Sequence, residues 1–190
     1  LYAGIGNPLS ISVPGVPMSA VSATMTNGTL SRNGDSWIAK PSKVGENATI
    51  TVTATIDGST QTVNTSTFRV RKLPDPVAFI TFTGQNGQPE RYKGGKPISK
   101  TTLMAAPGLD AAIDDDMLNI DFKVLGFETV FFDQMGNAIP EVAQGAQFSQ
   151  RQKDQFRRLS RGKRFYISRI RAIGPDGIER TLNPVEVIVN

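Results

Sequence analysis

Two residue types that carry much of protein chemistry, cysteine and histidine, are missing from this chain of 190 residues. Without cysteine, neither a disulfide nor a thiolate metal site can form. Without histidine, the chain lacks the usual general base at neutral pH, the commonest metal ligand and any Ser-His-Asp arrangement. We therefore expect no enzymatic activity, no metal or cofactor, and no small-molecule substrate.

Long apolar segments are missing as well. No apolar run approaches the roughly 18 residues that a membrane span needs, and no signal peptide is visible. The chain starts at Leu1 rather than at Met. This start is typical of a fragment or a processed form, and it leaves room for an anchor or targeting segment upstream.

The composition that remains is that of a globular, turn-rich protein. Hydrophobic residues make up 38% of the chain, which also has 18 Gly and 12 Pro. Such a chain can bury real cores, and its length fits two domains of about 70 to 120 residues each. The net charge of +4 is small, so a partner with a negatively charged patch fits better than a polyanion wrapped around the whole molecule.

The first 73 residues show short alternating segments separated by turns. The clearest strand runs from Ala48 to Ile56, with Ala, Ile and Val facing inward and Thr facing outward. Asn27-Gly28 and Asp57-Gly58 are typical hairpin turns. The spacing predicts an Ig-like β-sandwich over residues 1–73, without the cysteine pair of antibody domains and with Trp37 in its core.

A proline-containing linker, residues 74–76, is expected to separate this sandwich from a second β-rich domain over residues 77–190. Two prolines in three residues restrict the backbone and predict a short, semi-rigid joint. The predicted fold class is thus mostly β, with two tandem Ig-like β-sandwich domains and one added short α-helix in the second.

That helix belongs to the most basic part of the chain. Ser149 with Gln152 forms a capping-box pattern, which predicts a helix over about 150–161 that stops at Gly162. In the strand that follows, Tyr166 is expected on the buried side and Arg169 on the opposite, solvent-facing side. Against one acid, Asp154, the tract has nine Lys or Arg residues: Arg151, Lys153, Arg157, Arg158, Arg161, Lys163, Arg164, Arg169 and Arg171.

Three interpretations of this basic tract are open. It is a docking surface for an acidic patch on a partner protein, an ordinary solvated helix face, or a nucleic-acid site in which Phe165 and Tyr166 stack on bases. We favour a protein partner over nucleic acid. The residues that we expect to dock the partner are Arg157, Arg158, Arg161, Lys163 and Arg164.

Acidic residues give no convincing site. Asp114-Asp115-Asp116, with Asp110 and Asp121 nearby, lacks the alternating spacing of a calcium loop. Glu128 and Asp133 are a weak candidate for a glycosidase-like carboxylate pair. We expect both groups to be structural.

Several stretches resemble a known family when they are taken in order. In the second domain they are Tyr92-Lys93-Gly94-Gly95 followed by Ser99-Lys100 and Ala105-Ala106-Pro107-Gly108, then Leu159-Ser160-Arg161-Gly162, and finally Ala172-Ile173-Gly174-Pro175-Asp176-Gly177. The start, Gly4-Ile5-Gly6-Asn7-Pro8-Leu9 and then Val13-Pro14-Gly15-Val16, extends the likeness to the first domain. The whole chain resembles the C-terminal periplasmic part of the GldM/PorM family, a component of the type IX secretion system and gliding motility machinery of Bacteroidetes.

The resemblance implies a structural, non-enzymatic role in protein transport. It implies a homodimeric rod in the periplasm that is anchored in the inner membrane by a segment absent from this chain. Its partners would be a GldL/PorL-type protein in the inner membrane and GldK/GldN (PorK/PorN) ring proteins associated with the outer membrane. The rod would transmit motion between them. The alternative from the sequence is a tandem Ig-like adhesin or ligand-binding module at the cell surface.

Overall fold

The computed structural model describes residues 1–115 and 117–190. The chain divides into two compact units, which are described separately. Unit 1 comprises Leu1–Leu73 together with the turn Pro175–Ile178, and unit 2 comprises Pro74–Gly174 together with Glu179–Asn190. Within unit 1, the carboxylate of Asp176 accepts a hydrogen bond from the backbone N–H of Leu73 at 2.8 Å.

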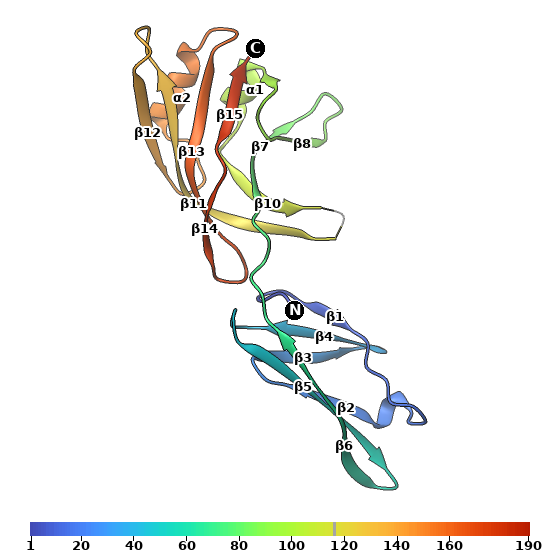
Figure 1. Cartoon of the computed structure of the whole chain (residues 1–190). Coiled ribbons are helices and arrows are strands. Elements are labelled where there is room, and N and C mark those ends of the chain that lie inside the picture. The colour runs from blue at the N-terminus through green and yellow to red at the C-terminus, as the bar shows by residue number, and fades with distance from the viewer. Residues whose placement is uncertain (116) are drawn as a thin grey trace. The chain divides into compact units, whose positions relative to one another are not determined.

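Unit 1 is a sandwich of two antiparallel sheets, each with three strands in the order β1-β4-β3 and β2-β5-β6 (Figure 1). The sandwich forms because β5 alternates from Ala48 to Ala54: its Ala and Val side chains and Ile50 are buried between the sheets, and its Thr side chains face outward. The inward position predicted for Ile56 is wrong, because this side chain at the end of the strand is 40% exposed. Trp37 is 5% exposed in the core, as expected. The elements are β1 (Asn7–Leu9), a 3₁₀ turn (Met18–Ala20), β2 (Val21–Met25), β3 (Gly28–Asn33), β4 (Ser36–Pro41), β5 (Asn47–Ile56) and β6 (Ser59–Arg69).

The turn at Asn27-Gly28 is not the hairpin that its sequence suggests. β2 pairs with β5, whereas β3 pairs with β4, so the chain changes sheets at this turn. Asn27 has the positive φ that such a turn needs, but its side chain bonds across to the backbone of Lys43 through both its oxygen and its nitrogen. The tertiary contacts of Asn27 thus override the local hairpin preference.

Unit 2 is built on one large, mostly antiparallel sheet in the order β8-β7-β10-β11-β13-β15-β9, with β12 beside β11 and β14 beside β13. β11 is the central long strand and pairs with β10, β12 and β13. The strands are β7 (Val77–Thr83), β8 (Pro89–Tyr92), β9 (Pro97–Ile98), β10 (Asp110–Asp114), β11 (Asn119–Phe132), β12 (Ala138–Gln144), β13 (Arg164–Ile173), β14 (Glu179–Leu182) and β15 (Val185–Val189).

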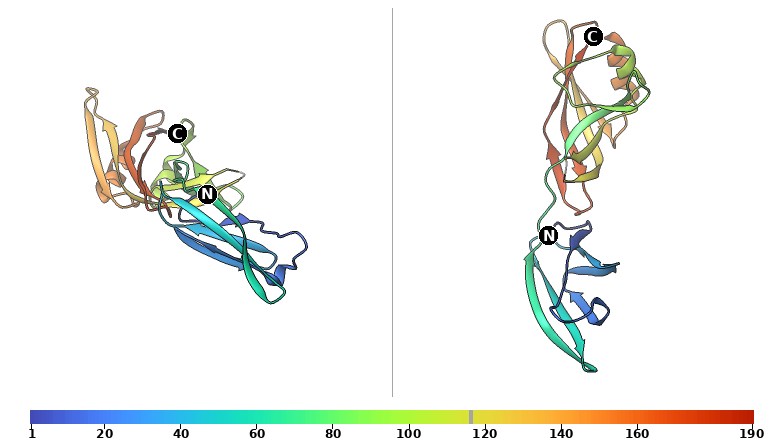
Figure 2. Two further views of the ribbon diagram at one scale, coloured as in Figure 1. Left: turned by 60° about the horizontal axis from the view of Figure 1, so that its bottom comes forward. Right: turned by 90° about the vertical axis from the view of Figure 1, so that its right-hand side faces the viewer.

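Two short helices, α1 (Lys100–Ala105) and α2 (Gln150–Arg158), pack on the same side of this sheet (Figure 2). Their packing leaves the opposite face of β12, β11, β13 and β15 uncovered by any described helix. The predicted fold class, mostly β with Ig-like sandwich arrangements, is confirmed. Neither helix, nor any other in the described residues, is long and apolar enough to span a membrane.

Candidate functional site

Helix α2 begins at the capping box that the sequence predicts. The Ser149 side chain accepts a hydrogen bond from the backbone N–H of Gln152 at 3.2 Å, and the Gln152 side-chain oxygen accepts one from the backbone N–H of Ser149 at 2.9 Å. The two residues thus satisfy amides that a helix start leaves free.

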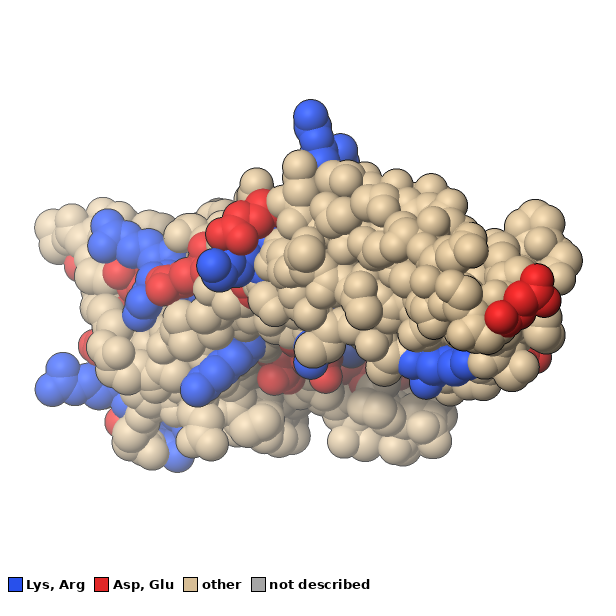
Figure 3. All heavy atoms as spheres, turned by 90° about the horizontal axis from the view of Figure 1, so that it is seen from below, with Lys and Arg blue, Asp and Glu red and all other residues tan. Residues whose placement is uncertain are grey.

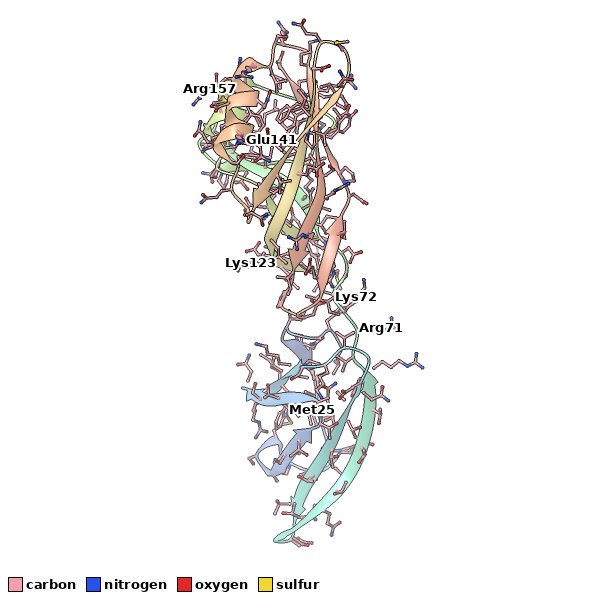
Figure 4. All side chains as sticks on the ribbon, turned by 90° about the vertical axis from the view of Figure 1, so that its left-hand side faces the viewer. Met25, Arg71, Lys72, Lys123, Glu141 and Arg157 are labelled. Atoms are coloured by element: carbon pink, nitrogen blue, oxygen red, sulfur yellow. The ribbon has the colours of Figure 1, made fainter. Side chains whose placement is uncertain are left out.

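Two buried side chains attach α2 to the sheet. Phe156 is fully buried in a cluster of aromatic rings, with ring centres 5.9 Å from Phe131, 5.0 Å from Phe148 and 5.1 Å from Phe165. Gln152 is also fully buried, and its side-chain N–H donates to the backbone oxygen of Glu141 at 2.9 Å. Figure 4 shows Glu141 on the strand next to the helix, and Arg157 on the helix itself.

The helix ends earlier than predicted. It stops at Arg158, with Leu159 as an extended C-cap, and not near Arg161. Gly162 has a positive φ of 83°, but it lies in a separate turn closed by a hydrogen bond from the Lys163 N–H to the Ser160 oxygen at 3.1 Å. Arg161 and Lys163 therefore lie on a turn between the helix and β13.

The prediction for Tyr166 is wrong. Phe165 and Ile167 are fully buried, whereas Tyr166 is 37% exposed on the opposite face. The reason is a β-bulge where β13 pairs with β11, because Arg169 adopts a left-handed φ of 48° and shifts the register. Beyond the bulge the alternation is as predicted, with Ala172 buried and Arg171 exposed.

Four of the nine basic residues in the tract are engaged in ion pairs. Arg157 pairs with Asp154 at 2.7 Å, Arg164 with Glu186 at 2.9 Å, Arg169 with Glu128 at 3.7 Å and Arg171 with Glu179 at 3.1 Å. Exposed pairs of this kind stabilise by only about 0–1 kcal/mol each. They do, however, neutralise two of the expected docking residues, Arg157 and Arg164.

The other expected docking residues keep their charge available. Arg158, Arg161 and Lys163 are exposed and form no ion pair within the described residues. Arg151, also exposed, and Lys153, which is half-buried, form none there either. Arg158 at the end of α2 and Arg161 and Lys163 in the turn that follows form a cationic surface. We call these three residues the basic turn. A positive charge here also suits the partial negative charge at a helix C-terminus.

A further cation near this surface was missed from the sequence. Lys100, the first residue of α1, donates from its side-chain nitrogen to the backbone oxygen of Arg157. It satisfies a carbonyl group at the open end of α2. The two residues are far apart in the chain, and only the packing of α1 against α2 brings them together.

The acidic residues considered as sites have structural partners instead. The Asp114 carboxylate lies 2.9 Å from Arg91 and 3.9 Å from Lys93, and Asp110 accepts from the Thr81 hydroxyl at 2.7 Å. Asp115 bonds the backbone of the following turn. Asp116 lies outside the described residues. Across the part of the chain that is described, no three side chains of metal-ligand type gather together.

Glu128 and Asp133, the other acidic residues considered, each bond to separate partners in the structure. Glu128 pairs with Arg169, as described above. Asp133 holds the turn between β11 and β12, because its carboxylate accepts hydrogen bonds from the Asn137 side chain and from the backbone N–H groups of Met135 and Asn137. These bonds, led by that from the Asn137 side chain, lower the pKa of Asp133.

The comparisons with known proteins cover both units. Residues 1–71 match a family model described as the GldM third domain, and residues 74–190 match one described as the GldM C-terminal domain. A search of curated proteins finds no match. The two matches follow one another along the chain in the order in which the family names its domains.

Proposed function

Because the chain belongs to the GldM family, we propose that it is the distal part of a dimeric periplasmic rod that links an inner-membrane motor to an outer-membrane-associated ring. The family is a component of the gliding motility and type IX secretion machinery, and its C-terminal domains are periplasmic. It is a structural machine component and not a known enzyme family. The rod, the dimer and the transmission of motion are our proposal.

The construction of each unit supports a mechanical role. The sheets are held by long ladders of paired strands, such as the ten paired positions between β5 and β6, which a single register shift between Val52 and Thr53 interrupts. Close-packed cores of this kind deform little under load. Pro74 and Pro76 restrict the segment that joins the units. We infer that such units carry displacement along the chain better than a flexible tether would.

The proposed partners follow from the family and from the charge of the surface. We assign the ring proteins, of GldK/GldN type, to the cationic surface at the end of α2, which consists of Arg157, Arg158, Arg161, Lys163 and Arg164. A second copy of the chain completes the dimer. A GldL/PorL-type protein in the inner membrane would bind a segment outside this chain, which would also provide the anchor.

The observation that carries this assignment is the unpaired charge of the basic turn. Arg158, Arg161 and Lys163 are exposed on an ordered helix end and turn, and no carboxylate among the described residues neutralises them. An acidic patch on a partner would gain from long-range attraction, which mainly speeds association and weakens as salt rises.

A salt-titrated pull-down with candidate ring proteins tests the assignment. The test variant is Arg158→Glu/Arg161→Glu/Lys163→Glu, and the control is Lys40→Glu/Lys43→Glu/Arg69→Glu, which changes the net charge by the same amount on exposed residues of unit 1. We expect the test variant to lose capture at low salt and the control to keep it. Equal capture by both variants and the native chain rejects the basic turn as the docking site.

A further inference from the structure

The uncovered face of the large sheet in unit 2 is unusually apolar for a solvent-facing surface. On β11 and β13, Phe132 is 49% exposed and Tyr166 is 37% exposed, and their rings meet edge to face with centres 6.1 Å apart. Val142 on β12 is 58% exposed, and Met135 in the neighbouring turn is 87% exposed. Proteins seldom group large apolar side chains on an open surface without a use for them.

The pairing of the strands makes these residues neighbours. Val130 lies opposite Tyr166, and Val142 lies opposite Glu128. The buried residues that alternate with them, Phe131 and Phe165, contact Phe156 of α2 on the other side of the sheet. The exposed set therefore shares one face, which we call the open face, defined as Val130, Phe132, Pro140, Val142 and Tyr166.

Charges border the open face at both ends. The basic turn leads directly into β13, two residues before Tyr166. At the other end, Arg169 has 83% of its side chain exposed and lines a hollow of about 200 Å³ together with Glu128, Val142 and Arg171. Gly126 forms part of the same hollow. The layout is an apolar centre with a charged rim, in which Arg164, Arg169 and Arg171 are paired with carboxylates and the basic turn is not. An apolar centre with a polar rim is typical of a protein docking site.

We propose that the open face is the centre of the docking surface, and that its occupant is a partner protein with an apolar patch bordered by carboxylates. This inference rests on the proposed function, because it takes the partner to be the one that the basic turn attracts. Tyr166 and Phe132 act as the anchors, and the rim cations fix the orientation.

The charges argue against two other occupants. A second copy docked by this face would bring two sets of unpaired cations into one interface, and like charges there are costly. An anionic lipid surface would meet the carboxylates of Glu128 and Glu186, which lie on the same face of the sheet. A protein partner can place its carboxylates against Arg158, Arg161 and Lys163 and its apolar side chains beside Glu128 and Glu186, which a uniformly anionic lipid surface cannot do.

The experiment measures binding of the native chain and of Phe132→Thr/Tyr166→Thr to the ring proteins of the pull-down, from low to high salt. Both positions are solvent-exposed, and Thr suits a strand, so the variant should keep its fold. We expect binding at least about tenfold weaker, because anchor residues of this type commonly contribute more than about 1.4 kcal/mol, which is a factor of ten. This loss should persist at high salt.

The matched control is Ile56→Thr/Val63→Thr, which removes two apolar side chains that are 40% and 39% exposed in unit 1. It should bind like the native chain. Binding of Phe132→Thr/Tyr166→Thr within about twofold of native overturns the inference. If the basic-turn variant still fails in that case, the proposed function stands without the open face.

Two further readouts separate the other occupants. Light scattering would show a native dimer that Phe132→Thr/Tyr166→Thr converts to a monomer if a second copy covers the face. Co-sedimentation with phosphatidylserine vesicles, abolished by the same variant, would assign the face to a membrane. Either result overturns the inference. The absence of capture by the native chain overturns the inference and the assigned ring partner together.

Discussion

Gln152 offers a sharp test of how α2 is held in place. Its side chain makes two hydrogen bonds of 2.9 Å, accepting from the Ser149 N–H and donating to the Glu141 oxygen, and it is fully buried. Gln152→Leu keeps the size of the side chain but leaves both backbone groups without their partners. An unsatisfied group of this kind costs about 1–3 kcal/mol.

The expected loss in the free energy of unfolding is smaller than twice the upper limit for one unsatisfied group. Both bonds are only partly shielded from water, so we take about 1.5 kcal/mol for each, and the more apolar leucine returns a part of this. We expect Gln152→Leu to lower the free energy of unfolding by about 2–3 kcal/mol. For a unit of this size, that corresponds to a fall in melting temperature of about 8–12 °C.

Calorimetry and far-UV circular dichroism are the suitable assays. The fluorescence of Trp37, the single tryptophan, reports on unit 1 and not on the unit that contains Gln152. The control is Gln150→Leu on the same helix, where the exposed side chain donates a hydrogen bond to Asp154. A melting temperature for Gln152→Leu equal to that of this control would refute the reasoning.

A second variant at the same position tests which of the two hydrogen bonds Gln152 accepts and which it donates. Gln152→Glu keeps an acceptor for the Ser149 N–H but places a carboxylate against the Glu141 carbonyl oxygen. It should be less stable than the native chain at neutral pH, and the difference should narrow as the pH falls and the carboxyl group gains a proton that it can donate.

Three other predictions concern residues of unit 2. Phe165→Ala should lower the free energy of unfolding by about 3–5 kcal/mol, whereas Tyr166→Ala should cost about 1 kcal/mol or less, as measured by urea unfolding; the reverse order would contradict the register at the bulge. Tyr92→Phe removes the hydroxyl that donates to the Lys96 backbone oxygen and accepts from the Ile188 N–H at 3.2 Å, and should cost about 1–2 kcal/mol at neutral pH. Burial raises the pKa of Tyr92. Ionisation would remove the proton donated to Lys96 and leave a charge in a half-buried site, so the native chain should lose stability as the pH rises above about 10, which a comparison of melting curves with the variant measures. Asp133→Asn should lower the melting temperature at pH 7, because the pKa of Asp133 is lowered in the fold. The difference from the native chain should disappear as the pH falls below about 4 and the native carboxylate gains a proton. A difference that stays constant down to about pH 2 would contradict the role of the carboxylate.

Features that depend on a few neighbouring residues could be predicted from the sequence. The capping box of Ser149 and Gln152 and the tight turn at Asp57-Gly58 are both present, because their bonds and backbone angles are local. The alternation of β5 also predicted its buried face from Ala48 to Ala54, since a period of two admits no other assignment once one face is apolar. It failed at Ile56, where the strand ends and the side chain is exposed.

Features that depend on distant contacts could not. Arg169 adopts a left-handed conformation that arginine rarely takes, and nothing next to it in the sequence signals the bulge. The exposed position of Tyr166 goes with that bulge, whereas Val130, Phe132, Pro140 and Val142 lie on the open face through the pairing of β11 with β12. Asn27-Gly28 was misinterpreted for a similar reason, because the choice of sheet is made by partners far along the chain.

Strand β6 is an edge strand of its sheet, and this affects how the protein behaves in concentrated solution. Among the described residues β6 pairs with β5 alone, and from Ser59 to Phe68 it contains neither proline nor any charged side chain. Figure 3 shows a wide surface with few Lys, Arg, Asp or Glu residues. The unpaired backbone N–H and C=O groups of an edge strand can form hydrogen bonds with a strand of another molecule. Many proteins prevent this pairing with a lysine or a proline in the edge strand. Concentrated solutions of this chain should therefore be prone to slow fibrous association, and one lysine in place of Thr62 should suppress it.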